Sequence, residues 1–581
     1  GSALNTLTLD NSSGNAFVNK YGSATDVWQA PLILNDNTDW NIFTGTLDVS
    51  GVSNAQVSYS GSGNTIKNGA GALRLNIDST TVPYTGNWVV NMGTLNIGGA
   101  NSAAPTSLGS GTGGITLNGI GRSDLAVFSL NNNGTASDTT VTYSGNNDVI
   151  VQGAGRLNVD RNFVSGANDR VTHVLDNLTF NGGILSVTSG NGHNLRFDGV
   201  TSLVSDYNIF QAEANTVATK ANLILAGVID DGVNSRSIIK ESVGRMLITN
   251  SANTFDGLTV VRDGVLELAT GATVGSGGVI VSRGVLSVAD TATLNAVSAT
   301  TGGLKLVGQL GTSRYSLPMV GYSGSANIDA GNPINFNVPV SGAVLGVDGV
   351  TGTTSVNSSN IDLAQVGSGS ERVWLGNVPG FDRTYRGTLT NSTGGDLRLL
   401  SPTNTLILDT NANILGGAGA TNNVVFGYDH GNAILITSSN IQNVNAVTSG
   451  GTFSGGGTVS VRINNDPTLG SITVNRGVTA NISGAVTTPL GTGIVTSLGG
   501  TLSSDNTTTA QFGNTDFRLY GGGTLLLDNR PGKPPQPILN HLRVNILRIH
   551  KNITKFGILI NIPFIINKRI IINNLTMTYS K

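Results

Sequence analysis

The chain has 581 residues, a formal net charge of −2, 38% apolar residues and 11% charged residues. It contains 80 glycines and no cysteine, so disulfides and thiolate metal sites are excluded. This apolar share, combined with low net charge, is not typical of a disordered chain. The length exceeds what one globular core usually organises, but a solenoid grows along one axis and avoids that limit.

Ten short segments share one pattern, in which a glycine precedes alternating apolar and polar residues. The segments are Gly45–Val49, Gly71–Leu75, Gly93–Ile97, Gly155–Val159, Gly183–Val187, Gly264–Leu268, Gly284–Val288, Gly302–Leu306, Gly395–Leu399 and Gly523–Leu527. Alternation predicts half-buried strands. The three central copies follow one another at intervals of 20 and 18 residues. Because one such strand cannot cover its own apolar side, this repeat predicts coils stacked on one another.

We therefore predict an all-β fold, a right-handed parallel β-helix over residues 1–530. Six residues are expected inside it in ladders: Leu266, Leu268, Leu286, Val288, Leu304 and Leu306. Trp28, Trp40 and Trp88 lie near the N-terminus, where filling the first coils is favoured over a ligand platform. We find no apolar stripe of helical period with caps at both ends in this region.

The composition changes at Pro531. Residues 531–581 contain 8 basic residues and no acidic residue, and isoleucine and asparagine replace glycine. The segment Pro531–Pro537 is a proline-rich joint, semi-rigid and extended. For the tail at 538–581 we favour a cap on the last coil or a non-native end over a basic anchor at a membrane surface. Its apolar run is interrupted by Asn561, Asn567 and Lys568, which argues against a membrane span.

The segment from Gly227 to Leu268 carries the most specific pattern in the chain. It joins a strand that ends at Lys240, a Leu-rich strand, and the run Asn253-Thr-Phe-Asp-Gly257-Leu-Thr-Val-Val-Arg-Asp-Gly264-Val-Leu. This segment resembles the autotransporter-associated β-strand repeat, with Phe255 in place of the usual tyrosine. Weaker copies of its Tyr/Phe-x-Gly element occur at Phe43 and Tyr385.

The resemblance implies a bacterial surface protein of the β-helical passenger type, which is exported and serves adhesion, a surface layer or a sheath. Its expected location is extracellular or on the bacterial cell surface. Autotransporters end in a β-barrel translocator, whereas this chain ends Thr578-Tyr-Ser-Lys581 without its alternating strands. The N-terminus has no basic and apolar signal pattern, so we expect either that a signal was removed or that this is a fragment.

The alternative function is a carbohydrate-active β-helical enzyme, either a polysaccharide lyase or a hydrolase. Such chemistry needs an acid and a base across one groove. Candidate fragments are Asn37-Thr-Asp39, Asp230-Asp231 and Asp429-His430-Gly431. They are roughly 190 residues apart, or about 40 Å in a stack of coils, so we interpret them as coincidental and predict no catalytic residue.

No cofactor or metal site is predicted either. His173, His193 and His430 are isolated in sequence. Calcium at the turn Asn35–Asp39 is a minor alternative, and the Gly-rich run Gly109–Gly114 lacks the Lys-Ser/Thr of a phosphate loop. Nucleic acid is disfavoured because residues 1–530 are acidic. The expected partners are other copies of the chain or surface glycans, the latter held by a flat face rich in Asn, Ser and Thr.

Overall fold

The computed structural model describes residues 5–408 apart from short gaps, together with ten further strands between residues 422 and 527. The gaps within 5–408 are 52–54, 79–83, 100–104, 106–107, 112, 146, 162–168, 214–221, 308–317, 340–341, 350–355, 368–372, 379–381, 393–396 and 400–405. The chain divides into two units, Gly1–Lys305 and Leu306–Lys581. The predicted tail and its proline-rich joint lie outside the described residues.

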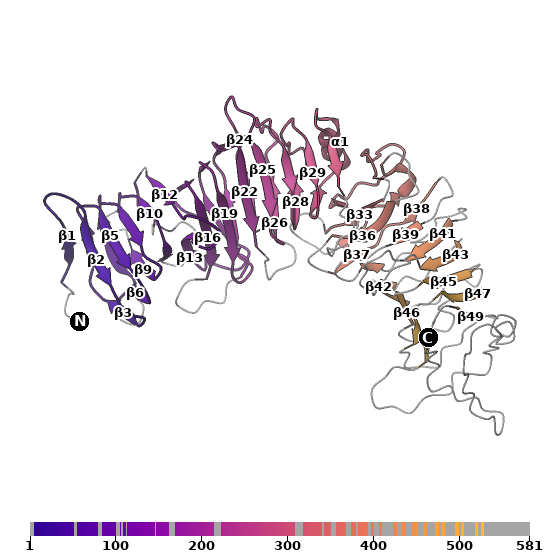
Figure 1. Cartoon of the computed structure of the whole chain (residues 1–581), viewed down its shortest axis with the longest axis horizontal. Helices are drawn as coiled ribbons and strands as arrows, with labels where there is room; N and C mark the ends of the chain where they lie inside the picture. The colour runs from indigo at the N-terminus through magenta and orange to yellow at the C-terminus, as the bar shows by residue number, and fades with distance from the viewer. Residues whose placement is uncertain are drawn as a thin grey trace, which may run out of the picture. The chain divides into compact units, whose positions relative to one another are not determined.

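Unit 1 is built from three sheets of parallel strands, which we call sheets one, two and three (Figure 1). Sheet one contains β1 (Leu7–Leu9), β4 (Leu32–Leu34), β7 (Val57–Gly61), β9 (Ala72–Asp78), β11 (Gly93–Gly98), β13 (Ala126–Asn131), β16 (Ala154–Asp160), β19 (Ile184–Ser189), β22 (Tyr207–Ala212), β25 (Ser237–Glu241), β27 (Thr259–Val261), β29 (Val279–Val281) and β31 (Leu304–Leu306), with β3 (Thr25–Trp28) and β6 (Thr46–Val49) attached. Sheet two contains β2 (Ala16–Lys20), β5 (Thr38–Ile42), β8 (Thr65–Asn68), β10 (Trp88–Val90), β12 (Gly114–Leu117), β15 (Asp148–Val151), β18 (Leu178–Phe180), β21 (Thr201–Leu203) and β24 (Ile229–Asp230). Sheet three contains β14 (Thr140–Thr142), β17 (Thr172–Leu175), β20 (Asn194–Phe197), β23 (Leu223–Leu225), β26 (Arg245–Ile248), β28 (Val265–Leu268) and β30 (Val285–Val288).

Each complete coil contributes one strand to each sheet. The coil that begins with β15 on sheet two continues through β16 on sheet one and β17 on sheet three, and the next coil repeats this order as β18, β19 and β20. Neighbouring strands pair in parallel register, so equivalent side chains stack from coil to coil. One inward ladder on sheet one runs through Leu47, Leu73, Leu95, Phe128, Leu157 and Val187. Full burial of each side chain of this kind contributes about 1.5–3 kcal/mol.

The six predicted core residues are all buried, with 0–8% of their surface exposed. Leu266 pairs with Leu286, and Leu268 pairs with Val288, as predicted. Leu304 and Leu306 do not extend that ladder, because β31 belongs to sheet one, where it follows β29. The third copy of the repeat, Gly302–Leu306, is therefore buried as predicted but belongs to a different sheet from the first two copies.

A helix, α1 (Thr291–Ala299), interrupts the strand order between β30 and β31 (Figure 1). The sequence did not predict it, since its apolar stripe is short. Asp290 begins the helix by accepting a hydrogen bond from the Thr293 amide. Leu294 and Val297, three residues apart, are the apolar residues that it buries. The inserted helix explains why the glycine repeat at Gly302 falls on another sheet.

The preference for core filling over a ligand platform is confirmed for two of the three tryptophans. Trp40 and Trp88 are fully buried. The Trp88 ring lies 4.6 Å from that of Tyr84, and its indole N–H donates to the Leu108 carbonyl. Trp28 is half-buried and meets Trp40 edge to face at 6.2 Å between ring centroids.

Unit 2 repeats the parallel design. One sheet contains β32 (Met319–Tyr322), β33 (Ala343–Val347), β36 (Val373–Asn377), β39 (Leu397–Leu399), β41 (Asn422–Phe426), β43 (Val444–Ser449), β45 (Ser471–Asn475), β47 (Ile494–Leu498) and β49 (Phe517–Tyr520). A second contains β34 (Val356–Asn357), β37 (Arg383–Tyr385), β40 (Leu406–Leu408), β42 (Ala433–Ile436), β44 (Gly457–Val461), β46 (Val478–Ile482), β48 (Thr501–Ser504) and β50 (Thr524–Leu527). A short pair, β35 (Ile361–Asp362) and β38 (Leu389–Thr390), lies beside the 3₁₀ turn η2 (Leu363–Gln365).

The chain is therefore an all-β parallel solenoid over residues 7–408, with about 13 turns. All ten glycine-led segments of the sequence coincide with strands. The predicted right-handedness of the coil remains a prediction.

Candidate functional site

The aspartates proposed as enzyme-type fragments lie far apart. Asp39 on β5 and Asp230 on β24 occupy the same outward row of sheet two, seven strand-to-strand steps from each other. At about 4.8 Å for each step, the separation is about 34 Å. The third fragment, Asp429–Gly431, lies outside the described residues. Asp39 and Asp230 therefore cannot act on one substrate bond.

These carboxylates instead connect neighbouring coils. Asp39 accepts hydrogen bonds from the side-chain amides of Asn15, at 2.8 Å, and Asn68, at 3.1 Å. Asp231 is only 3% exposed, and its Oδ2 accepts the backbone N–H groups of Arg236 and Asp256. Their oxygens are thus used to join one coil to the next.

The turn considered for calcium is also held by coil-to-coil bonds. Asp36 accepts the backbone N–H of Asn11, and Asn35 donates to Asp10. Asn37 accepts the backbone N–H of Asn64 at 2.9 Å. Among the described residues, no group of three or more His, Asp or Glu side chains is arranged to hold a metal ion.

His173 and His193, isolated in sequence, meet in the core. The register places His173 beside Leu195 on sheet three, so its ring points inward. Its Nε2 lies 2.9 Å from Nδ1 of His193, and its Nδ1 lies 3.0 Å from the Tyr143 hydroxyl. Burial, and then the neighbouring His193, lower the pKa of His173 well below its usual value. The imidazole is therefore neutral near pH 7, which suits a hydrogen-bonded core chain.

Two fully buried lysines form what we call lysine clamps. The Lys67 ammonium donates to the carbonyls of Asn68 and Gly69 at the end of its own strand and of Met92 on the next coil. Lys240 does the same with Glu241, Ser242 and Asp263. Burial lowers the pKa of each lysine to about 7. Each clamp satisfies carbonyl groups from two coils at a corner where the strand hydrogen bonds stop.

Asparagine side chains form two ladders along sheet two. In the first, each amide donates to the asparagine of the preceding coil at 2.8–3.1 Å, through Asn19, Asn41, Asn68, Asn91 and Asn118. In the second, the side-chain oxygens of Asn37, Asn64 and Asn87 accept backbone N–H groups of the following coil. The first ladder ends where Gln152, with a longer side chain, takes the next position.

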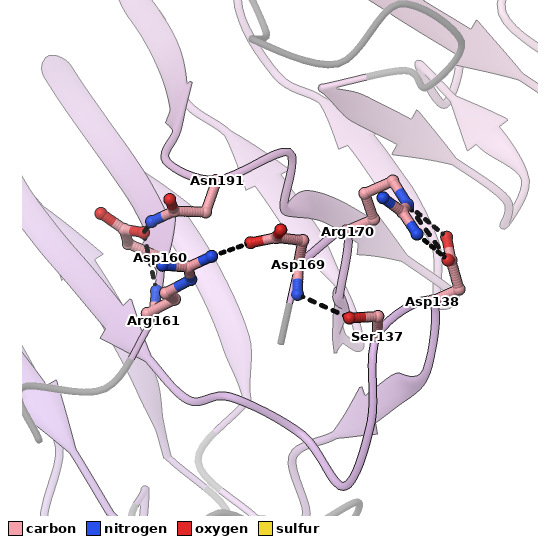
Figure 2. Close-up of polar contacts among 7 residues, drawn as sticks. All are labelled: Ser137, Asp138, Asp160, Arg161, Asp169, Arg170 and Asn191. Atoms are coloured by element: carbon pink, nitrogen blue, oxygen red, sulfur yellow. Dashed lines mark hydrogen bonds and ion pairs between the residues drawn. The ribbon is translucent and has the colours of Figure 1, made fainter. Parts of the chain in front are cut away.

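A network of ion pairs covers one corner between sheets one and three (Figure 2). Arg170 binds Asp138 with three hydrogen bonds, the shortest at 2.6 Å, and Arg161 binds Asp169. Asp138 and Arg170 both have positive φ, at 61° and 60°, and occupy the same position on successive coils. The pairs are partly exposed, so solvent screens them and each contributes little to stability.

Two further groups complete this corner (Figure 2). Asp160 accepts hydrogen bonds from the Arg161 backbone and from the side-chain amide of Asn191, both at 2.7 Å. The Ser137 hydroxyl accepts the Asp169 backbone N–H at 3.0 Å. Three successive coils are thereby joined at their surface, so we assign this network to coil cohesion.

The outer surface of sheet two differs from those of the other two sheets. Outward residues of sheets one and three are often buried, as for Ser186 and Ser287 at 0% exposure. On β8, β10, β12, β15, β18 and β21, buried residues instead alternate strictly with partly exposed ones. We call the outward residues of β2 to β21, with those just before and after each strand, the open face, and it is the candidate binding surface of the chain.

Three rows of side chains make up the open face. The central row is Phe17, Asp39, Ile66, Val89, Thr116, Ile150, Thr179 and Ser202. The row before it is Asn15, Asn37, Asn64, Asn87, Gly114, Asp148, Asn177 and Val200, and the row after it is Asn19, Asn41, Asn68, Asn91, Asn118, Gln152, Asn181 and Val204. These positions include two carboxylates and no lysine or arginine.

Comparisons with known proteins supply no relative: no protein-family model, curated protein or solved structure matches the chain. No helix in the described part of the chain is long and apolar enough to span a membrane.

Proposed function

We propose that this chain is a secreted or cell-surface structural and adhesive protein of the β-helical passenger type. The single observation that carries the proposal is that the residues of the repeat-like segment 227–268 fasten successive coils together. A sequence selected to stack coils is what a surface scaffold requires, because its function depends on extension and presentation rather than on one reactive centre.

Asn253 supports this most directly, because it contacts three segments. Its Oδ1 accepts the Ile229 N–H, and its Nδ2 donates to the carbonyls of Asn250 and Thr273. Phe255, only 2% exposed, fills the corner beside it. The motif residues thus have a structural role in coil stacking, which supports the proposal.

The glycines of the motif have the same role. A Cβ atom on Gly257 would lie 2.1 Å from the Arg236 carbonyl oxygen of the preceding coil. Gly264 has a φ of +64°, and its Cβ would lie 2.3 Å from the Ser242 carbonyl oxygen. Only glycine permits this close backbone approach, so both positions favour tight coil stacking.

Surface location is tested by chemical labelling of the cells that produce the protein. The chain has no cysteine, so single-cysteine variants are specific. Val233→Cys, at a fully exposed position, should react with a membrane-impermeant maleimide on intact cells, whereas Leu286→Cys, fully buried, should react only after denaturation. If Val233→Cys reacts only after the cells are broken, the proposed location is wrong.

The enzyme alternative is tested separately. The purified chain, incubated with polygalacturonate and with neutral polysaccharides, should release neither reducing ends nor unsaturated products. Sustained release that survives repurification would replace the scaffold proposal with a lyase or hydrolase.

A further inference from the structure

We propose that the open face of sheet two binds neutral polysaccharide chains. This inference deepens the proposed surface function by naming a ligand class. The labelling of intact cells does not depend on sugar binding. The proposed surface location and the proposed polysaccharide binding can therefore fail independently.

The shape of the face suits an extended polymer. Its eight strands extend about 35 Å along the solenoid, and its three rows span about 13 Å across the strands. The resulting area, about 450 Å², is below the roughly 800 Å² that each partner contributes to a stable protein interface. A second copy of this chain is therefore a poorer occupant of this face than a narrow, elongated ligand.

The chemistry across the face combines apolar and polar strips. The middle of the central row presents Ile66, Val89, Thr116 and Ile150, which are partly exposed and offer contact to the C–H surface of a sugar ring. An asparagine amide has two N–H groups and two acceptor lone pairs. An interior residue such as Asn41 or Asn91 uses one N–H group and one lone pair for its hydrogen bonds within the ladder. The remaining donors and acceptors recur once per coil and suit the hydroxyl groups of a repeating polymer.

Exposed aromatic rings stand at the N-terminal end of the same face. Phe17 begins the central row and is 64% exposed. Tyr21 and Phe43 lie two residues beyond Asn19 and Asn41, beside the outer asparagine row, and their rings stack 4.8 Å apart with an angle of 11° between planes. Aromatic side chains supply large contact area at low entropic cost, and here they extend the apolar strip for a sugar chain.

The charge of the open face determines which class of polysaccharide it can bind. The charged groups on the described positions of the face are the carboxylates of Asp39 and Asp148, which accept hydrogen bonds from asparagine side chains. Without a basic residue among these positions, an anionic polymer meets only repulsion. The face therefore favours neutral polysaccharides over acidic ones.

The test is a sedimentation assay of the full chain with insoluble cellulose, chitin and mannan, and with polygalacturonate as the anionic probe. The face variant is Thr116→Lys combined with Ile150→Glu, whose new charges lie on adjacent strands and pair with each other. The control variant is Val233→Lys, at a fully exposed position outside the face. Circular dichroism and thermal unfolding first establish that both variants keep the wild-type fold.

We expect wild type and the control to bind at least one neutral polysaccharide, the face variant to lose at least tenfold in affinity, and none to bind polygalacturonate. The proposal is overturned if no neutral polysaccharide binds, if the face variant binds like wild type, or if polygalacturonate binds as well. A sedimentation-velocity measurement adds a further arm. Oligomers that dissociate only in the face variant would make the face a self-association surface and also overturn the proposal.

Discussion

His173 lies in the core between Tyr143 and His193. Val141 occupies the position of His173 on the preceding coil, and Leu195 occupies it on the following coil. Burial lowers the pKa of His173 in the folded chain, so the unfolded chain takes up a proton near pH 6.5 and the folded chain does not. Its contribution is therefore complete above pH 6.5 and decreases below it. The expected loss is up to about 1.4 kcal/mol for each pH unit.

The measurement is the free energy of urea unfolding at about pH 7.5 and about pH 5 for wild type and His173→Leu. Leucine matches the residue at the equivalent position on the next coil, so the variant should fold. It should lose part of the acid sensitivity. An equal loss of stability in both proteins would show that His173 does not titrate on unfolding.

Lys240 gives a second prediction on pH, with the same sign as for His173 but in a more alkaline window. Burial is the main reason that its pKa falls from its ordinary value of 10.5 to about 7 in the folded chain. Between these values the unfolded chain holds a proton that the folded chain lacks, so stability should rise as pH increases across this window. Lys240→Met should remove the share of this rise that Lys240 contributes and leave the share of Lys67, whose pKa is lowered in the same way.

The substitution should also cost about 1–3 kcal/mol at pH 7, since three buried carbonyl groups lose their donor. Arg283→Met, on the exposed side of a corner, serves as the control in the same unfolding series. A Lys240→Met variant as stable as wild type at pH 7 would contradict the role of the clamp.

The contacts and roles of single residues were the hardest features to predict from the sequence. The sequence shows that the repeat contains Lys240 but does not reveal its function. The reason is that one of the three carbonyl groups to which its ammonium donates belongs to the next coil. The sequence carries a local signal for Lys67, which precedes the corner glycine Gly69 by two residues, but not for Lys240, which has Ser242 at that position. The contact between His173 and His193 depends on the length of one coil, and coil lengths vary too much for the spacing alone to reveal it.

At the scale of elements, close approach between coils is set by glycine. A Cβ on Gly227 would lie 1.7 Å from the Gly199 carbonyl oxygen, whereas a Cβ on Gly121 would have nothing within 4 Å. Gly227→Ala must displace the backbone of a neighbouring coil and should cost about 1–3 kcal/mol or more. Gly121→Ala, the matched control, should change the melting temperature little. Equal melting temperatures for the two variants would contradict the packing at Gly227.

Strands were predictable from sequence, while their assignment to sheets was not. Glycine followed by alternating apolar residues located β28 and β30 correctly, because period two follows from strand geometry. The same pattern cannot identify which of three sheets a strand joins. Helix α1 shifted β31 to sheet one, and its nine residues carry too little apolar periodicity to be recognised.

At the scale of the whole molecule, repetition made the architecture predictable. One strand of this kind has no independent core, so ten copies required stacking. The open face was anticipated only as a flat surface rich in Asn, Ser and Thr. Its position on sheet two follows from which outward side chains other segments leave exposed, and that depends on tertiary packing.

The central claim is that each coil is held in place by its neighbours. Leu266→Asp tests it most directly, because Leu266 is fully buried and pairs with Met246 and Leu286. An unpaired carboxylate there should cost several kcal/mol. Native-state hydrogen exchange by mass spectrometry should show faster exchange in β26, β28 and β30 first, with β9 and β11 of the same unit protected as in wild type. Uniform loss of protection across unit 1 would contradict the account.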